Sequence, residues 1–252
     1  MDKSTGKSTL AVIPAAGAGT RLGQPIPKTL VPISGERRVI DVILGEIAPL
    51  VDQIAVIVAP DFEDFIDEPL SSGEMLPRLC VQPSPTGMCD ALRCSDDMWA
   101  DVDRLLVVWG DQVNLSNQTL SRALAQHAFR DQCAVIPTTL IDDPYVQYDF
   151  DQSRLVAVRQ SRDGDQCDKQ GLTDVGVFVI STPGLHDLIG AFAESTPRSA
   201  ATGELNLLPL FPFLQNHGWF VESSLVADPT EANGINTVAE LDSARMRLEA
   251  MQ

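Results

Sequence analysis

The stretch AVIPAAGAGTRLGQPIPK, residues 11–28, decides how the chain begins to fold and what it can bind. An apolar run gives way to small residues that leave backbone N–H groups open to a ligand. Arg21 and Lys28 then add two cations seven positions apart, and Pro27 stiffens the chain before the lysine. A bare backbone followed by two cations is suited to the phosphates of a nucleotide. The candidate phosphate-binding residues are Ala15, Ala16, Gly17, Gly19, Thr20, Arg21 and Lys28.

The composition and net charge of the chain limit the classes of molecule that it can bind. The chain has 252 residues, 44% of them hydrophobic and 21% charged, as in soluble globular proteins. Its formal net charge of −17 predicts that it does not bind nucleic acid or an anionic membrane. A phosphorylated small molecule stays allowed, because cations lining a site act within a Debye length of about 8 Å. Five cysteines without paired spacing and a first apolar run too short for a signal peptide lead us to expect a cytoplasmic protein.

Hydrophobic patterning predicts the fold class. Short runs rich in Val and Ile are typical of strands that are covered on both faces, and amphipathic segments lie between them. This alternation predicts an α/β fold, Rossmann-like, with a mostly parallel sheet and helices on both faces. Ligands of such sheets bind beyond the carboxyl ends of the strands. The predicted strands are 10–15, 54–59, 104–109, 133–139 and 175–181, and the predicted helices are 38–50, 87–99, 116–128, 183–194, 204–215 and 237–250.

The chain reads as one domain over residues 1–252, with 1–9 as a flexible tail. Residues 144–171 break the alternation and predict a β-hairpin and a polar loop, a small mixed β subregion inserted over one side of the site. We find no internal repeat, so a second domain built from repeats is not expected. Association into a homo-oligomer is left open.

Two motifs carry a resemblance to a known family. AAGAGTRLGQPIPKTLVPI, residues 15–33, resembles the signature of the sugar-1-phosphate nucleotidylyltransferases. VQPSPTGMCDAL, residues 81–92, is similar to the base-recognition stretch of the uridylyl- and thymidylyltransferases in that family. The resemblance implies that Gln82 bonds the pyrimidine edge, for which its amide has both a donor and an acceptor. It also implies that Gly87 lets the base pack against the backbone.

The resemblance extends to a metal site and a sugar site. Asp111, in WGDQ at the end of a predicted strand, would hold Mg²⁺ against the triphosphate, whereas an isolated Gly-Asp pair is more often a plain turn or helix cap. NGINTVAEL, residues 233–241, puts Asn236 in the place of the second metal ligand. The segments TDVG and TGELNLLP resemble the sugar-facing segments of the family. They nominate Asp174, Gly176 and Glu204.

One segment departs from the family pattern. The hairpin before TDVG usually carries a glutamate that holds a sugar hydroxyl, often followed by a lysine for the sugar phosphate. Here Arg159 or Gln160 stands in the place of the glutamate, and no lysine matches. Either Arg159 or Arg162 pairs with a phosphate or carboxylate of the substrate, or both arginines are solvated on the hairpin.

The resemblance implies an enzyme, a Mg²⁺-dependent nucleotidyltransferase. It would join a pyrimidine nucleoside triphosphate, UTP or dTTP, to a sugar 1-phosphate and release pyrophosphate. Arg21, Lys28 and Asp111 would be the catalytic residues, the two cations stabilising charge on the α-phosphate and the pyrophosphate. Two alternatives stay open. One is a cytidylyltransferase that acts on a phosphorylated alcohol or amino-alcohol, and the other is a non-catalytic, nucleotide-binding regulatory relative.

Overall fold

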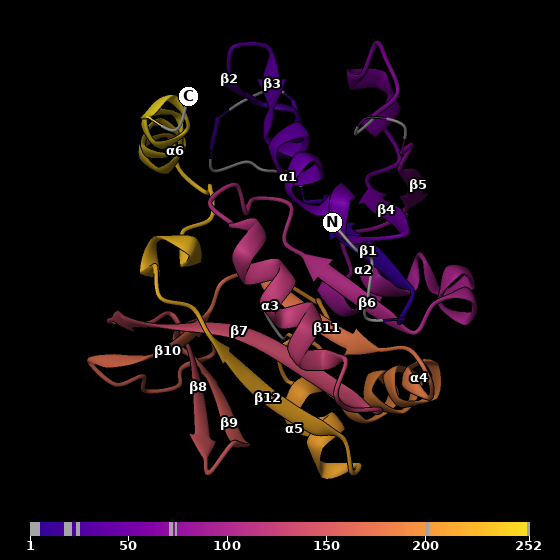
Figure 1. The fold of residues 1–252 in the computed structure, drawn as a ribbon, viewed down its shortest axis with the longest axis vertical. Helices are drawn as coiled ribbons and strands as arrows, with labels where there is room; N and C mark the ends of the chain where they lie inside the picture. Colours follow the sequence, from indigo (N-terminus) through magenta and orange to yellow (C-terminus); the bar gives the residue numbers. More distant parts are fainter. Residues whose placement is uncertain are drawn as a thin grey trace.

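The computed structural model describes residues 6–17, 22–23, 26–70, 73, 75–199 and 202–250, and a twisted sheet forms its centre (Figure 1). The strands of this sheet are β1 (Thr9–Pro14), β4 (Gln53–Val58), β5 (Arg78–Val81), β6 (Arg104–Val108), β7 (Cys133–Asp142), β10 (Gln170–Asp174), β11 (Val177–Ser181) and β12 (Phe220–Leu225). Among the described residues, seven of them follow the order β10-β7-β11-β6-β1-β4-β5, and β12 also pairs with β7.

The sheet is mixed, and its parallel part holds the predicted core strands. β1 runs parallel to both β4 and β6, and β4 runs parallel to β5. β11 is antiparallel to β6 and to β7, and β10 is antiparallel to β7. The predicted mostly parallel α/β fold is confirmed, with β10 and β11 as the antiparallel members. Because β1 and β6 are parallel neighbours, the loops that follow them leave the sheet side by side.

Helices cover both faces of the sheet, as the sequence predicts. Alternate residues of β1 point to opposite faces: Ala11 and Ile13 pack in a cluster with α1, α3 and α6, while Leu10 and Val12 pack in a cluster with α2, α4 and α5. All four of these residues are fully buried. The helices are α1 (Val39–Ile47), α2 (Met88–Arg93), α3 (Asn117–His127), α4 (Leu185–Ser195), α5 (Leu210–Asn216) and α6 (Val238–Ala250). Short 3-10 turns span Lys28–Leu30, Ala48–Leu50, Phe62–Phe65, Asp96–Asp101, Ser161–Asp163 and Pro229–Ala232.

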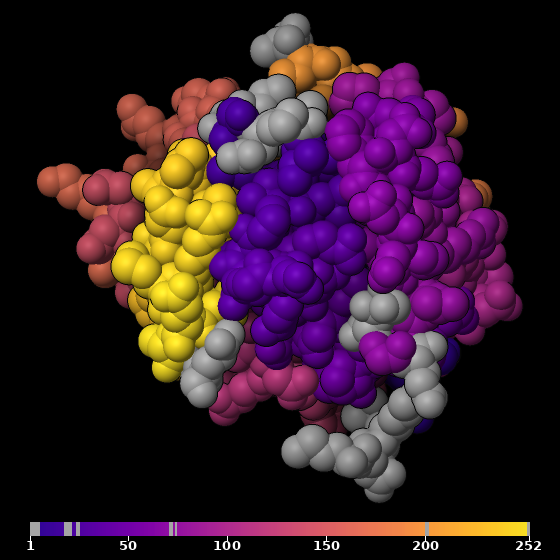
Figure 2. Space-filling view, turned by 90° about the horizontal axis from the view of Figure 1, so that it is seen from above, coloured from indigo at the N-terminus to yellow at the C-terminus, as the bar shows by residue number. Residues whose placement is uncertain are grey.

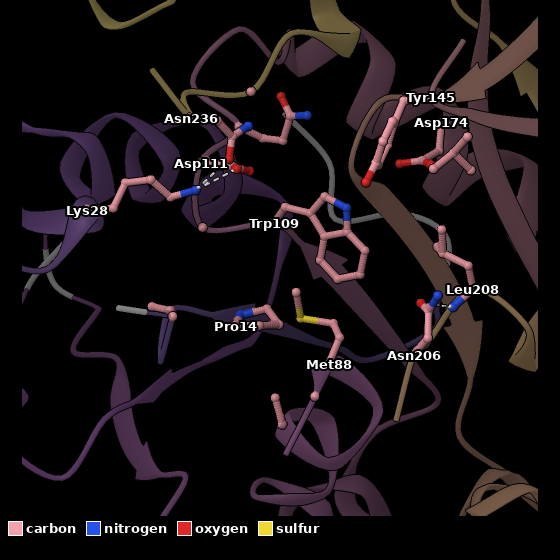
Figure 3. Close-up of a pocket in the computed structure, with 18 of the residues that line it drawn as sticks. Pro14, Lys28, Met88, Trp109, Asp111, Tyr145, Asp174, Asn206, Leu208 and Asn236 are labelled. Atoms are coloured by element: carbon pink, nitrogen blue, oxygen red, sulfur yellow. Dashed lines mark hydrogen bonds and ion pairs between the residues drawn. The ribbon is translucent and has the colours of Figure 1, made fainter. Parts of the chain in front are cut away.

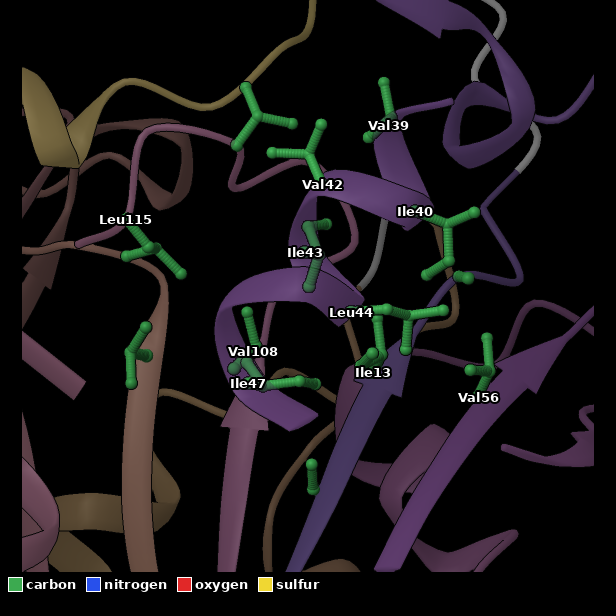
Figure 4. Close-up of a cluster of buried hydrophobic side chains, with 14 of the residues drawn as sticks. Ile13, Val39, Ile40, Val42, Ile43, Leu44, Ile47, Val56, Val108 and Leu115 are labelled. Carbon is green, nitrogen blue, oxygen red and sulfur yellow. The ribbon is translucent and has the colours of Figure 1, made fainter. Parts of the chain in front are cut away.

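Helix α1 shows how the apolar pattern becomes packing. Ile40, Ile43, Leu44 and Ile47 recur at helical spacing and are all buried against the strands beneath (Figure 4). Burying each of these side chains contributes about 1.5–3 kcal/mol. The Asp41 carboxylate accepts the backbone N–H of the residue before the helix at 2.8 Å, so the helix starts at a capped end. The helix ends at Ile47, just before the 3-10 turn that contains a proline.

Two smaller units lie beside the sheet. The short strands β2 (Pro32–Ser34) and β3 (Arg37–Arg38) lead into α1. Strands β8 (Val146–Asp151) and β9 (Arg154–Gln160) form an antiparallel hairpin within 144–171, and they lie near the end of the sheet that holds β7, β10 and β12 (Figure 1). Gln215 of α5 bonds both backbone groups of Leu155 in β9, at 3.1 and 2.9 Å, and so fixes the hairpin to the helix.

The last helix returns to the start of the chain. Seen from above, α6 lies beside the N-terminal segment that carries β2, β3 and α1 (Figure 2), and Arg245 donates to the carbonyl of Pro32 at 2.8 Å. Of the segment 1–9 that was predicted to be a flexible tail, Lys7 and Ser8 already bond to the body of the protein; the backbone N–H of Ser8 donates to Asp103 at 2.7 Å. None of the helices in the described ranges combines the length and the apolar character that a membrane crossing needs.

Candidate functional site

A cavity of about 790 Å³ lies at the carboxyl ends of β1 and β6. Figure 3 shows its length: Lys28 and Asp111 face each other at one end, Tyr145 and Asp174 lie at the other, and the ring of Trp109 stands between them. The structure brings ten predicted site residues to this cavity. They are Ala15, Ala16, Gly17, Lys28, Gln82, Gly87, Asp111, Asp174, Glu204 and Asn236. Three further predicted residues, Gly19, Thr20 and Arg21, lie outside the described residues.

The ends of β1 and β6 approach each other because of a glycine. A Cβ atom on Gly110 would lie 2.7 Å from the carbonyl oxygen of Pro14 and 3.1 Å from the side chain of Thr29. No larger residue fits there without moving the backbone. The backbone N–H of Ala15 donates to Ile57 at 2.7 Å and so extends the parallel ladder by one residue. Residues 15–17 therefore line the cavity beside the Gly-Asp turn that follows β6.

Three side chains converge at this end. The ammonium of Lys28 donates to the Asp111 carboxylate at 2.7 Å and to the amide oxygen of Asn236 at 3.4 Å. Asp111 and Asn236 are far apart in sequence, but the 233–236 loop docks on Asp111: Ile235 donates its N–H to the Asp111 carbonyl at 3.0 Å. One point in the cavity is therefore within reach of a cation, a carboxylate oxygen and an amide oxygen.

This donor set fits a hard divalent cation. A carboxylate and an amide oxygen are ligands that Mg²⁺ takes, and Mg²⁺ is usually held by one or two carboxylates together with substrate phosphates. Among the described residues, no group of three or more His, Cys, Asp or Glu side chains could hold a metal by itself. Asp111 and Asn236 could therefore hold such an ion if a bound phosphate completed its coordination.

Glu240 orients Asn236 and was not nominated from the sequence. Its carboxylate accepts the backbone N–H groups of Asn236 at 2.8 Å and of Thr237 at 2.7 Å, while Thr237 Oγ1 accepts the backbone N–H of Glu240 at 3.3 Å. This reciprocal pair is a capping box, which fixes the start of α6. The T-x-x-E spacing before the helix was the signal that could have found it.

The segment after β5 forms a second wall. Gln82 is buried, and its Nε2 donates to the carbonyl of Gly87 at 3.1 Å. Gly87 has φ +112°, and a Cβ there would lie 2.5 Å from the backbone nitrogen and oxygen of Leu205. Leu205 in turn bonds the carbonyl of Thr86 at 2.8 Å. The 82–87 loop is thus held against the segment that carries Glu204, and this pairing needs a glycine.

Asp174 lies at the far end, half-buried. It accepts the hydroxyl of Tyr148 at 3.1 Å and the backbone N–H of Gly176 at 2.8 Å. Burial raises the pKa of the Asp174 carboxyl above its usual range, and these hydrogen bonds only partly oppose the effect. Gly176 does not line the cavity. Its positive φ and the absence of a side chain allow Trp109 and Gln112 to pack over it.

Arg159 does not line the cavity. Its guanidinium lies 2.7 Å from Asp149 and 2.8 Å from Asp168, and these hydrogen-bonded carboxylates raise its pKa. Gln160 and Arg162, in contrast, both line the cavity. Between the two residues that the sequence left open for the place of the glutamate, the geometry favours Gln160. Trp109, Gln112, Tyr145 and Asn206 also line the cavity and were not nominated from the sequence.

Comparisons with known proteins agree with this arrangement. Residues 11–172 match the family model described as MobA-like NTP transferase domain. The protein named Bifunctional protein GlmU from Bradyrhizobium diazoefficiens is 27% identical over 252 residues, which cover 98% of this chain and 54% of that protein. The protein of the same name from Aquifex aeolicus is 28% identical over 242 residues, which cover 90% of this chain and 50% of that protein. The chain thus spans about half the length of the curated relatives it matches.

A solved structure supports the fold. It is described as a putative glucose-1-phosphate thymidylyltransferase from Bacillus anthracis in complex with a sucrose, and it superposes with a TM-score of 0.75 over 95% of both chains at 17% identity. The family model covers more than half of the chain and includes the motifs at residues 15–33, 81–92 and 109–112. The resemblance that these motifs carry is therefore confirmed at the level of the family, and the chain belongs to the MobA-like NTP transferase domain family.

Proposed function

We propose that the chain is a Mg²⁺-dependent nucleotidyltransferase that joins UTP or dTTP to a sugar 1-phosphate and releases pyrophosphate. The observation that carries the proposal is the convergence of Lys28, Asp111 and Asn236 at one end of the cavity. A lysine that faces two metal-ligand oxygens beside an open backbone loop suits a triphosphate and its counterion. The family membership of the chain supports the same class of reaction.

In the proposed reaction, an oxygen of the sugar phosphate attacks the α-phosphorus of the nucleotide. The new P–O bond forms as the bond between the α-phosphorus and the bridging oxygen breaks, and pyrophosphate leaves with that oxygen. Lys28 stabilises the negative charge that grows on the phosphates, and the backbone N–H groups of Ala16 and Gly17 position them. Asp111 and Asn236 would hold Mg²⁺, which would neutralise phosphate charge and fix the phosphate geometry.

Gln82 suits the edge of a pyrimidine base. Because the carbonyl of Gly87 can only accept a hydrogen bond, the atom of Gln82 that bonds it is the Nε2 donor. Oε1 and the second N–H of Nε2 then remain for a ligand. Oε1 can accept the N–H at N3 of uracil or thymine, or the 4-amino group of cytosine, so the proposed preference for uracil or thymine rests on the similarity of residues 81–92 to the base-recognition stretch of the family.

A cytidylyltransferase that acts on an amino-alcohol phosphate stays as a second candidate. We call the end of the cavity that holds Tyr145 and Asp174 the acceptor end. The rings of Trp109 and Tyr145 project toward this end, where Asp174 also lies (Figure 3). Aromatic faces beside a carboxylate suit a quaternary ammonium. Gln82 can pair with cytosine as well as with uracil, so the base and the acceptor have to be tested together.

Pyrophosphate release tests the proposal. The chain would be assayed with Mg²⁺ and UTP, dTTP or CTP, each against a panel of sugar 1-phosphates and phosphocholine. Asp111→Asn should lower turnover about 100- to 1000-fold. Asp187→Asn makes the same chemical change at a carboxylate that is 97% exposed and remote from the cavity, and it should leave turnover unchanged.

The outcomes separate the candidates. Release with UTP or dTTP and a sugar 1-phosphate, lost in the Asp111 variant, would support the proposed reaction. Release only with CTP and phosphocholine would favour the second candidate. Nucleotide binding without release from any pair of substrates would contradict catalysis and favour a regulatory relative.

A further inference from the structure

The acceptor end of the cavity holds two amides whose orientation the backbone determines. The backbone N–H of Leu208 donates to the Oδ1 atom of Asn206 at 3.1 Å. Because an N–H can only donate, the oxygen of Asn206 must face it, and Nδ2 of Asn206 faces Gln160 at 2.7 Å. Gln160 therefore uses its Oε1 atom in this bond. The Nε2 group of Gln160 is left as a donor. Within the described part of the chain, this group makes no hydrogen bond.

Gln160 is held in this position from several sides. It is the last residue of β9, it is only 4% exposed, and its backbone N–H donates to the Asp165 carboxylate at 2.9 Å. Its side chain nevertheless lines the cavity. A buried amide that is fixed by one bond and offers an unused N–H donor selects for a ligand atom that accepts.

Arg162 brings a positive charge to the same wall. It lies two residues further on, in the 3-10 turn Ser161–Asp163, and also lines the cavity. Among the residues that the structure describes, the acid nearest to Arg162 is Asp163 at 3.6 Å, which is too long for a hydrogen bond, so the N–H groups of Arg162 are left for a ligand. Arg159, by comparison, is engaged by two carboxylates.

We propose that Gln160 and Arg162 form a docking site for an oxyanion of the acceptor substrate, an inference that rests on the proposed function. An amide N–H and a guanidinium both donate, and a phosphate or carboxylate oxygen accepts from both. A glutamate at position 160 would instead repel an anion and would attract hydroxyl groups. Gln160 thereby determines specificity: it favours an anionic group at a position where a carboxylate would exclude one. The oxyanion is either the reacting phosphate of the acceptor or a separate carboxylate on it.

Acceptor binding without turnover tests the site. Calorimetry on the full chain would use glucose 1-phosphate, glucuronic acid 1-phosphate and phosphocholine, each with and without a non-hydrolysable UTP analogue. Gln160→Glu keeps the size of the side chain and its bond from Asn206, but it replaces the donor with an anion. Arg162→Gln changes an exposed side chain and leaves the core intact. Arg154→Gln removes the same charge at an exposed position on the same hairpin that does not line the cavity.

We expect both cavity variants to weaken binding about ten-fold or more, because a hydrogen bond to a charged group is lost in each. Arg154→Gln should bind as the unchanged chain does. An equal loss for all three probes identifies the phosphate as the docked group, and a loss confined to glucuronic acid 1-phosphate identifies a carboxylate. The inference is overturned if no probe binds, or if both variants bind like the Arg154 control. Acceptor binding without pyrophosphate release would count against the proposed catalysis alone.

Discussion

Replacing Gly87 by alanine tests how the nucleotide wall is built. The residue combines φ +112° with ψ 171°, a backbone conformation that is essentially restricted to glycine. A Cβ would also lie 2.5 Å from the nitrogen and from the oxygen of Leu205, well inside van der Waals contact. Both Leu205 atoms are hydrogen bonded: the nitrogen donates to Thr86 at 2.8 Å and the oxygen accepts from Cys89 at 3.2 Å. Relieving the clash therefore separates two segments and breaks both bonds.

The expected loss of stability in Gly87→Ala has two contributions, backbone strain and lost hydrogen bonds. The strained backbone costs about 1–3 kcal/mol, and two lost hydrogen bonds cost about 1 kcal/mol each. Gly87→Ala should lower the free energy of unfolding by about 3–5 kcal/mol. Gly184→Ala is the matched control, because Gly184 also has a positive φ, +81°, but no atom lies within 4 Å of its virtual Cβ. It should cost only the strain, about 1–2 kcal/mol.

Urea denaturation of both variants measures the difference, and UTP binding measures its consequence. The Gly87 variant should also lose nucleotide affinity, because the loop that carries Gln82 moves with it, whereas the Gly184 variant should not. Equal destabilisation by the two substitutions would refute the reasoning, since it would mean that the contact with Leu205 contributes nothing. Unchanged UTP affinity in the Gly87 variant would show that the wall does not hold the nucleotide.

Two predictions concern titratable groups whose pKa is shifted by burial, Asp174 and His127. The raised pKa of Asp174 means that stability is lost as pH rises from 3.8 through the folded-state pKa; Asp174→Asn should therefore raise the urea midpoint at pH 7, and this gain should vanish below pH 3.8. A midpoint that does not change at pH 7 would contradict it. Burial lowers the pKa of His127 to about 4 from 6.5, so about 3 kcal/mol of stability is lost as pH falls from 6.5 to 4. His127→Gln can keep the bond to Ser181 Oγ, 3.0 Å long, and should reduce this acid sensitivity; the urea midpoint at pH 7 and at pH 4.5 checks it.

The sequence predicted the elements that hydrophobic burial determines. The Val- and Ile-rich strands β1, β4 and β6 have almost every residue buried, so their apolar runs predicted them to within about a residue. β5 and β12 were missed because about half or more of their residues remain partly exposed and their sequences alternate or include polar residues. The antiparallel direction of β11 was not predictable, because the pattern of a buried strand is the same in both directions.

The helix predicted at 204–215 shows how a tertiary contact overrides a local pattern. The helix begins at Leu210, and residues 204–208 run across the cavity wall instead. There Leu205 pairs with the backbone around Gly87, and Asn206 bonds both Leu208 and Gln160. These hydrogen bonds compensate for those that a longer helix would make. No periodicity in the sequence encodes the bonds to the Gly87 loop and to Gln160, because these partners are distant along the chain.

The site residues also differ in whether the sequence could predict them. Lys28, Asp111 and Asn236 were nominated through the motifs that carry the family resemblance, and the structure brings them to one end of the cavity. Gln160 could not be distinguished from Arg159 in sequence, because successive residues of a strand point to opposite sides and the register was unknown. The register of β8 with β9 decides it: Arg159 lies opposite Gln147, and Gln160 lies opposite Val146.

The two ends of the cavity differ in how easily their residues can be substituted. The groups proposed for phosphate chemistry depend on close backbone contacts, such as that of Gly110 with Pro14, and substitutions there disturb the core sheet. The β8–β9 hairpin is a separate two-stranded sheet, and Arg162 is exposed on the turn that follows it. A change of charge at such a position costs little stability, usually within 0.5 kcal/mol. From the proposed roles of the two ends, we expect that exchanging residues 144–171 between two such chains transfers acceptor preference and leaves base preference unchanged.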